Sequence, residues 1–373
     1  ATGAWKTILS LLGKTPSIEK ILKIASVDID KIIDDLIVEY VDNDSYVGMV
    51  GQPLSGLAAG FLNDTTGIDD KIDGEKISYN IKDSDPNAQA ELNFKSLSVG
   101  MGSNQNSVSF TWFANTGEKG SVQIAKKIDK PEGKSFPTDS SKYIEVKSEN
   151  FVTSSDKEYY TNRAVVNGLD ENTDYIYRVG NEGKWEGVHD LRINDLDGKF
   201  NFLFAGDPQI GSTGSIENDI KDWENSLNLA TEKFNDTSFI ISSGDQVNTS
   251  TSEKEYEGFL EHNALKGLRM ATVVGNHDSG AQNYSDHFYA PNVANDSGTK
   301  GTGKSGGDYW FKYNGVLFMM INSNNTNTEE HKKFMQEAIS ENSDINWKVV
   351  AFHHSIYSAG AHSDSGDILM RRE

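Results

Sequence analysis

The sequence contains no cysteine among its 373 residues. Disulfide bonds and metal sites with cysteine ligands are therefore excluded. It also has no stretch that is long and apolar enough to span a bilayer, so membrane insertion is not expected. Basic residues are scarce, since 35 lysines and arginines stand against 56 aspartates and glutamates, a net charge of −21. Nucleic acids and anionic membranes need a basic surface, so neither is an expected partner.

No signal peptide is recognisable, and the opening Ala1-Thr2-Gly3 is typical of a trimmed or engineered start. The absence of cysteine, together with many Asn, Ser, Thr and Asp residues, favours an exported bacterial protein, either secreted or on the cell surface. The length predicts two or three domains with an ample hydrophobic core.

Residues 1–90 predict a mainly helical region. Thr15 and Pro16 fit an N-cap and a first helical position, and apolar residues follow at helical spacing. We expect a packing module rather than a membrane-surface helix, because the aspartates nearby would repel anionic lipid.

Residues 91–197 predict an antiparallel β-sandwich. The hydrophobic period changes to two: Val108, Phe110 and Trp112 alternate with polar residues. The strand spacing fits a sandwich, and the run 169–179 around Tyr175 resembles the tyrosine-corner strand of fibronectin type III modules. We expect this domain to be a scaffold, with loops that shape a substrate crevice as the alternative.

Three short apolar runs, 202–205, 239–241 and 271–274, each end at a glycine. Two helix-like segments, 216–234 and 253–265, lie between them. The order strand, helix, strand, helix, strand predicts a parallel sheet, and continuous apolar runs predict strands that are buried on both faces.

Oxygen-bearing side chains follow the three glycines, namely Asp207, Asp245 and Asn276. The carboxyl ends of neighbouring parallel strands meet at one crevice, so these side chains should converge. The glycine before each lets the backbone turn sharply. A fourth apolar run, 349–352, ends at His353. A set of carboxylate, amide and imidazole ligands suits Zn, Mn or Fe better than Ca or Mg.

Four short motifs, in this order and each after a predicted strand, resemble those of the calcineurin-like metallophosphoesterases: Gly206-Asp207, Gly244-Asp245, Gly275-Asn276-His277-Asp278 and Val350-Ala351-Phe352-His353. Within that superfamily the purple acid phosphatases are the most similar, because a sandwich precedes the catalytic part. The resemblance implies an α/β catalytic domain over residues 198–373, an αββα sandwich. Strands at 308–313 and 316–321, around an Asn314-Gly315 turn, would build its second sheet. An amphipathic helix is predicted over 329–341.

The resemblance also implies two metal ions, Fe, Zn or Mn, with Asp245 bridging them. Asp207 would bind one ion, and Asn276 and His353 the other. Metal ions roughly 3.5 to 4 Å apart would clamp the phosphate and acidify bound water, which gives a hydroxide nucleophile. The phosphoryl group would then be attacked in line.

Two positions depart from the family pattern. Asn248 stands where the purple enzymes have a tyrosine ligand, so the purple colour should be absent. Gln209 stands where the other branch has a histidine. It could coordinate a metal through its amide oxygen, or it could only form a hydrogen bond.

Several histidines carry expected roles. By resemblance, His277 would protonate or stabilise the leaving alkoxide, and His362 would assist. Asp278 is expected to orient His277, and His354 to support the ligands from behind. We expect surface or packing roles for the remaining four, which are His189, His262, His287 and His331.

The family supplies two further metal ligands from a Gly-His-x-His motif beyond the fourth strand. This sequence ends at Arg371-Arg372-Glu373 without that motif. We therefore expect either a C-terminally truncated fragment, whose missing C-terminal segment acts as a partner, or an incomplete site. The fragment is the favoured expectation.

The expected function is metal-dependent hydrolysis of a small phosphorylated substrate, with phosphomonoesters first, as in acid phosphatases. A phosphodiesterase or nucleotidase of the same superfamily is the nearest alternative. The alternative from another class is a catalytically silent cell-surface binding protein that reuses the fold.

Overall fold

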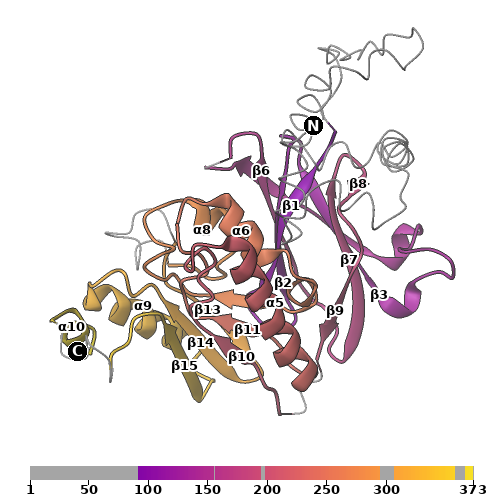
Figure 1. Cartoon of the computed structure of the whole chain (residues 1–373). Coiled ribbons are helices and arrows are strands. Elements are labelled where there is room, and N and C mark those ends of the chain that lie inside the picture. The colour runs from indigo at the N-terminus through magenta and orange to yellow at the C-terminus, as the bar shows by residue number, and fades with distance from the viewer. Residues whose placement is uncertain (1–90, 155, 195–197, 295–305, 358–365, 373) are drawn as a thin grey trace, which may run out of the picture. The chain divides into compact units, whose positions relative to one another are not determined.

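The computed structural model describes residues 91–154, 156–194, 198–294, 306–357 and 366–372 (Figure 1). Within these residues the strands form three sheets. The helical prediction for residues 1–90 and the prediction for His362 lie outside the described residues. In the described ranges, no helix combines the length and apolar character needed to cross a bilayer.

The predicted antiparallel strands over residues 91–197 form two layers. The strands of the first layer, in spatial order, are β1 (Phe94–Met101), β2 (Val108–Ala114), β6 (Tyr160–Val166) and β5 (Glu149–Val152). Those of the second layer are β4 (Ile144–Lys147), β3 (Gly120–Lys126), β7 (Thr173–Asn181) and the short β8 (Lys184–Trp185), with β9 (His189–Ile193) also paired to β7. All these pairs are antiparallel.

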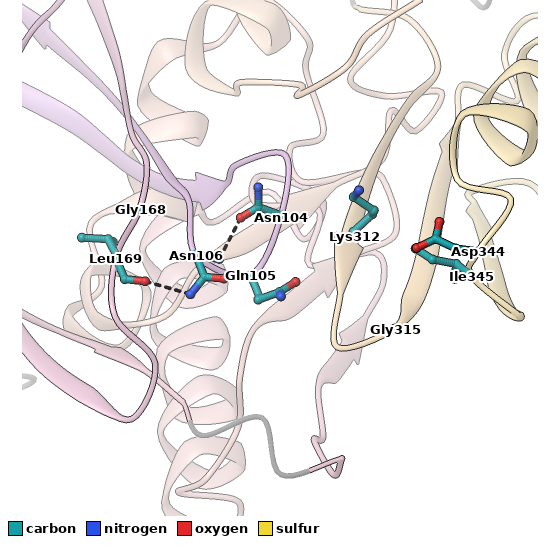
Figure 2. A pocket seen from close by; sticks show the side chains of 9 residues that line it. All are labelled: Asn104, Gln105, Asn106, Gly168, Leu169, Lys312, Gly315, Asp344 and Ile345. Carbon is teal, nitrogen blue, oxygen red and sulfur yellow. Dashed lines mark hydrogen bonds between the residues drawn. The ribbon is translucent and has the colours of Figure 1, made fainter.

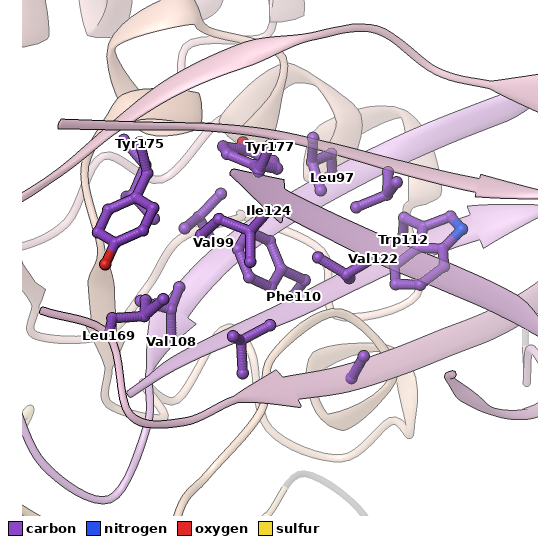
Figure 3. Packing of buried hydrophobic residues seen from close by; sticks show 14 of the residues in the cluster. Leu97, Val99, Val108, Phe110, Trp112, Val122, Ile124, Leu169, Tyr175 and Tyr177 are labelled. Atoms are coloured by element: carbon purple, nitrogen blue, oxygen red, sulfur yellow. The ribbon is translucent and has the colours of Figure 1, made fainter. Parts of the chain in front are cut away.

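The core of this sandwich lies between the two layers, as Figure 3 shows. Phe110 of β2 packs on Tyr177 of β7 with ring centroids 4.7 Å apart. The indole of Trp112 is completely buried and donates to Asn181 Oδ1 at 2.9 Å. The Tyr175 hydroxyl accepts a hydrogen bond from the backbone N–H of Asp170 at 2.8 Å. That backbone bond is the one expected in a tyrosine corner.

The three apolar runs form the predicted parallel strands. They are β10 (Leu203–Ala205), β11 (Ile240–Ser242) and β12 (Met270–Thr272). The first predicted helix is α5 (Ile216–Lys233). The second is divided into α6 (Glu253–Leu260) and α7 (Asn263–Gly267). The break falls at Glu261, whose carboxylate accepts from the backbone N–H of Ser96 in the sandwich.

The sandwich and the α/β part share one sheet. Strand β12 pairs in parallel with β1, at Gly100 opposite Met270, so the order β10-β11-β12-β1-β2-β6-β5 is continuous. Both faces of β2 are buried. Phe113, on the face of β2 away from the sandwich core, stacks on His287 of α8 (Asn283–His287) with centroids 4.5 Å apart. Tyr256 of α6 stacks on the same imidazole at 4.5 Å.

The prediction that all three parallel strands are buried on both faces is correct for β11 and β12 and wrong for β10. The Phe204 side chain of β10 is 61% exposed. Strand β10 lies at the edge of the sheet, and its Leu203 and Ala205 pack against the helical side. An apolar run therefore did not distinguish an edge strand from a central one.

The α/β part has a second sheet of its own, which is the third sheet of the structure and packs against β11 and β12. It consists of β13 (Tyr309–Tyr313), β14 (Val316–Ile321) and β15 (Trp347–Phe352). The predicted turn joins β13 and β14, with positive φ at Asn314 (45°) and Gly315 (74°). Strand β15 runs parallel to β14, and α9 (Thr328–Glu341) packs on the outer face of both. The short α10 (Gly366–Arg372) follows. The resulting layers are helix, sheet, sheet and helix, as expected.

Candidate metal centre

Four predicted ligands converge at the carboxyl ends of the strands. Asp207 follows β10, Asp245 follows β11 and His353 follows β15. One ligand atom from each lies within 4.8 Å of the other two. Asn276, after β12, places its Oδ1 3.2 Å from His353 Nε2. Residues from both sheets therefore meet at one point.

His353 offers a defined nitrogen to this point. Its Nδ1 lies 3.0 Å from the Ser243 carbonyl oxygen, which can only accept, so Nδ1 carries hydrogen. Its Nε2 is the nitrogen that faces Asn276 and Asp245, with 3.4 Å to Asp245 Oδ2. Burial opposes the charged ring, but the Asp245 carboxylate outweighs burial and raises the pKa of His353.

Asp245 is held as an anion. Burial favours its neutral form, but hydrogen bonds from His353 and from the backbone N–H of His277 outweigh burial and lower the pKa of Asp245. The His277 N–H reaches Asp245 Oδ1 at 2.9 Å. An ionised carboxylate with a buried side chain suits a metal ligand.

The backbone at the site is strained. Asp207, Gln209 and Asp245 have φ values of 55°, 40° and 52°, a region that non-glycine residues seldom adopt. The predicted glycine turn is present at Gly244, where φ is 105°. Gly275 is needed for close approach instead, because a Cβ atom there would lie 2.0 Å from Asp245 Oδ1.

The donor set fits a metal ion. Two carboxylates, one imidazole nitrogen and one amide oxygen face a common point. Oxygen ligands with one or more imidazoles suit Mn, Fe or Zn. The ligands come from four different loops that the fold itself holds together.

Gln209 and Asn248 form an amide pair beside this point. Gln209 Nε2 donates to Asn248 Oδ1 at 3.2 Å. Of the two roles considered for Gln209, the structure shows the hydrogen bond. This hydrogen bond uses the amide nitrogen of Gln209 and leaves its amide oxygen, Oε1, as the atom that could bind a metal ion.

His277 is oriented by a backbone carbonyl. Its Nδ1 lies 2.7 Å from the Asn248 carbonyl oxygen, so Nδ1 carries hydrogen and Nε2 is the nitrogen left for chemistry. The prediction that Asp278 orients this ring is wrong. The Asn248 carbonyl takes that part.

Asp278 instead joins two loops. Its buried carboxylate accepts hydrogen bonds from four backbone N–H groups, those of Asp245, Gln246, Val247 and Gly275, at 2.7 to 3.3 Å. Burial raises the pKa of Asp278 to about 7, although the N–H donors favour its anion. The residue therefore fixes the backbone on which Asp245 and Asn276 stand.

A turn that the sequence analysis missed lies behind the ligands. Asn324 Nδ2 donates to the carbonyl oxygens of Val274 (3.2 Å) and Gly275 (3.1 Å). Ser323 Oγ also lies 2.9 Å from His354 Nδ1, so His354 is hydrogen-bonded to this turn. The sequence did contain a signal for this turn, because the polar residues 322–325 directly follow the apolar run of β14, at the same end of the strands as the other ligand loops.

Figure 2 shows a polar hollow of about 680 Å³ that does not belong to this site. It is lined by residues such as Asn104, Lys312 and Gly315, and by none of the predicted site residues. Gly315 precedes β14, whereas the metal ligands lie beyond its other end. The hollow therefore lies at the other end of strand β14 from the metal ligands.

Comparisons with known proteins give two domain matches. Residues 94–192 match the family described as purple acid phosphatase, N-terminal domain, and residues 200–372 match calcineurin-like phosphoesterase. No curated protein matches the chain.

Among solved structures, the purple acid phosphatase PPD1 from yellow lupin (Lupinus luteus) seeds is similar, with a TM-score of 0.54 and 13% identity over 72% of this chain. The match covers 52% of the lupin protein, so the chain spans about half of that relative's length. A structure of PhoD matches over 70% of this chain and 62% of its own, with 11% identity and a TM-score of 0.46. The likeness to the lupin protein shows the fold.

Proposed function

We propose that this chain hydrolyses phosphate esters with the help of metal ions, because residues 200–372 match the calcineurin-like phosphoesterases and residues 94–192 match the purple acid phosphatase N-terminal domain. The observation that carries the proposal is the convergence of Asp207, Asp245 and His353 within 4.8 Å, beside Asn276. Phosphomonoesters are the proposed substrate class, because the preceding domain is of the purple acid phosphatase type.

Two metal ions of the Fe, Zn or Mn kind are proposed at this point. Asp245 is the proposed shared ligand, with Asp207 and the Gln209 amide on one side and Asn276 and His353 on the other. When bound, such ions polarise phosphoryl oxygens and make water a stronger nucleophile. The ligands are already arranged for binding, because the lowered pKa of Asp245 favours its anion and the Nε2 atom of His353 faces Asn276.

His277 is the proposed proton donor to the leaving group. In the reaction a water molecule gives up one proton to solvent, and its oxygen forms a bond to phosphorus while the bond to the leaving alkoxide breaks. The alkoxide would take its proton from His277 Nε2. Because Nδ1 is bound to the Asn248 carbonyl, Nε2 carries a proton only when the ring is an imidazolium.

The decisive test compares hydrolysis of p-nitrophenyl phosphate and bis(p-nitrophenyl) phosphate by chain that was stripped of metal and reloaded with Mn²⁺ or Zn²⁺. We expect metal-dependent turnover, faster on the monoester. Asp245→Asn should lower turnover at least about a hundredfold, the effect of removing one strong electrostatic group. The matched control is Asp222→Asn on the exposed face of α5.

Turnover that is unchanged in Asp245→Asn would contradict the site assignment. Faster hydrolysis of the diester would keep the site and reject the substrate class. Metal uptake without hydrolysis of either ester would favour a binding protein built on the same fold.

A further inference from the structure

The turn over residues 322–325, which follows β14, joins the two sheets at the metal centre. Asn324 binds the carbonyl oxygen of Gly275 in the loop after β12. Ser323 Oγ accepts from the backbone N–H of His354, after β15, at 3.1 Å. One short turn is thus bonded to the neighbours of two proposed ligands, Asn276 and His353.

Both ends of the 322–325 turn are held by one buried pair. Asp308 Oδ1 accepts from the backbone N–H of Asn322 at 2.9 Å. His331 of α9 places Nε2 2.8 Å from the carbonyl oxygen of Asn325. The two side chains meet each other, with 2.6 Å between His331 Nδ1 and Asp308 Oδ2. Asp308 is fully buried, and His331 is 8% exposed.

The geometry makes His331 the charged partner of an Asp308 carboxylate. Its two ring nitrogens face an oxygen of the Asp308 carboxyl group and a backbone carbonyl oxygen. With Asp308 ionised, both oxygens only accept, so both nitrogens carry hydrogen, which is the imidazolium form. The charged groups that face the ring are Asp308 and, from its own helix, Glu330. Burial opposes the charge, but Asp308 outweighs it and raises the pKa of His331.

The other cation at this turn comes from α10, where Arg371 Nε donates to the Ser323 carbonyl oxygen at 3.2 Å. We expected a surface or packing role for His331, but packing alone does not explain why both ring nitrogens face oxygen atoms, one of them from a buried carboxyl group.

We propose that Asp308 and His331 are positioning residues of the metal centre: as an ion pair they fix the 322–325 turn, and the turn fixes the loops of Gly275 and His354. Loss of the His331 proton breaks one of the two ring hydrogen bonds and loosens both loops. This inference rests on the proposed function, which it deepens by naming a protonation-dependent support.

The first experiment reads the ring directly. Nitrogen-15 spectra of the histidines are recorded on the metal-free full chain between pH 5 and 9. We expect both His331 nitrogens to be protonated at pH 7, above the ordinary histidine pKa of about 6.5. A neutral His331 ring at pH 6 would overturn the proposal. The measurement uses no metal and no substrate, so its failure is distinct from failure of the proposed function.

The second experiment measures amide exchange at His354 in wild-type chain and in His331→Gln, again without metal. We expect exchange about tenfold faster in the variant at pH 6, from the loss of a charge-assisted hydrogen bond, with the ratio falling towards one at pH 9. His262→Gln is the matched control, because that ring is also buried, lies at the N-cap of α7 and is bonded to the Gly258 carbonyl oxygen instead of the 322–325 turn. Equal exchange in wild type and His331→Gln at pH 6 would overturn the positioning role.

A third readout links the turn to the metal. The Kd for Mn²⁺ should be about tenfold higher in His331→Gln than in wild type at pH 6, and the two should converge at pH 9. Both proteins share the ligands' own pH dependence, so their ratio isolates His331. A ratio that does not change with pH would contradict the protonation step. Absence of Mn²⁺ binding in every variant would contradict the proposed function, while the first two experiments still decide the pair.

Discussion

At the scale of single residues, the buried carboxylate of Asp278 organises the backbone of the site. Its Oδ2 accepts from the N–H groups of Asp245 and Gly275, and its Oδ1 from those of Gln246 and Val247. Two loops that belong to different strands are thus fixed to one side chain. Their relative position decides whether Asp245 and Asn276 can reach the same ion.

Asp278→Asn should lower the free energy of unfolding by about 2 to 4 kcal/mol. An asparagine keeps one acceptor oxygen but turns an NH₂ group towards two of the N–H donors, which then lack a partner. Urea denaturation followed by circular dichroism measures the change. Asp236→Asn, on the exposed surface after α5, is the control and should be neutral. Equal stability of Asp278→Asn and wild type would show that the four hydrogen bonds are unimportant.

Asn276 and His277 are neighbours, but their substitutions should act differently. Either alanine variant should lower turnover at least about a hundredfold. Asn276→Ala should also weaken Mn²⁺ binding, because its Oδ1 faces the ligand cluster. His277→Ala should leave Mn²⁺ binding unchanged, because its ring is bonded to the Asn248 carbonyl instead. Turnover and calorimetric Kd are measured on each variant, and a His277→Ala chain that loses metal would move this residue among the ligands.

At the scale of secondary-structure elements, the site depends on how closely two loops approach. The loop after β12 passes so near Asp245 that a Cβ on Gly275 would lie 2.2 Å from the Asp245 backbone nitrogen. Nothing flexible separates the two, since the nearest atoms are a backbone nitrogen and a hydrogen-bonded carboxylate.

Gly275→Ala should therefore destabilise the protein by about 1 to 3 kcal/mol and abolish tight metal binding, because the added methyl group has to displace the Asp245 loop. Thermal unfolding and metal content per chain are the measurements. Gly366→Ala in α10 is the control, as no atom lies within 4 Å of its added Cβ. If Gly275→Ala kept both its metal and its melting temperature, the loops would have room that the structure does not show.

Elements defined by local signals were predictable from the sequence. Asn314-Gly315 specified a hairpin turn, and the amphipathic spacing after 328 specified α9. Features that depend on distant partners were not. The exposure of Phe204 follows from the edge position of β10, and the division of the second predicted helix follows from the contact of Glu261 with the sandwich.

The candidate site was predictable to the same extent. Four ligands could be placed because each follows a strand, and parallel strands end at one edge. The Asp308–His331 pair could not be placed, because the two residues are 23 positions apart and meet only through the packing of α9 on the second sheet. Asp278 was given the wrong partner, since a carboxylate beside a histidine in sequence does not have to contact its ring.

At the scale of the whole molecule, metal binding should stabilise the fold, because the ligands come from both sheets. A metal at about 100 times its Kd contributes about 2.7 kcal/mol if it binds only the folded chain. The melting temperature should then rise by about 5 °C with Mn²⁺ or Zn²⁺ and fall again with chelator. Scanning calorimetry measures the shift. Mg²⁺ at the same concentration is the comparison and should stabilise less, because an imidazole ligand favours the transition metals.

A melting temperature that is unchanged by any of these ions would contradict a site formed by the folded chain. A larger shift with Mg²⁺ than with Mn²⁺ would point to a site made of oxygen ligands alone, and would remove His353 from the ligand set.

The pairing of β1 with β12 makes the sandwich and the catalytic part neighbours within one sheet. The two family matches meet between residues 192 and 200, yet the hydrogen bonds cross that division elsewhere, at Gly100 and Met270. Removal of the sandwich would expose the edge of β12 and remove the Phe113 ring that stacks on His287. In evolutionary terms, the sandwich is not an interchangeable module. A recombination event that replaced it would have to supply a matching edge strand at the same time, so we expect the two domains to be inherited together.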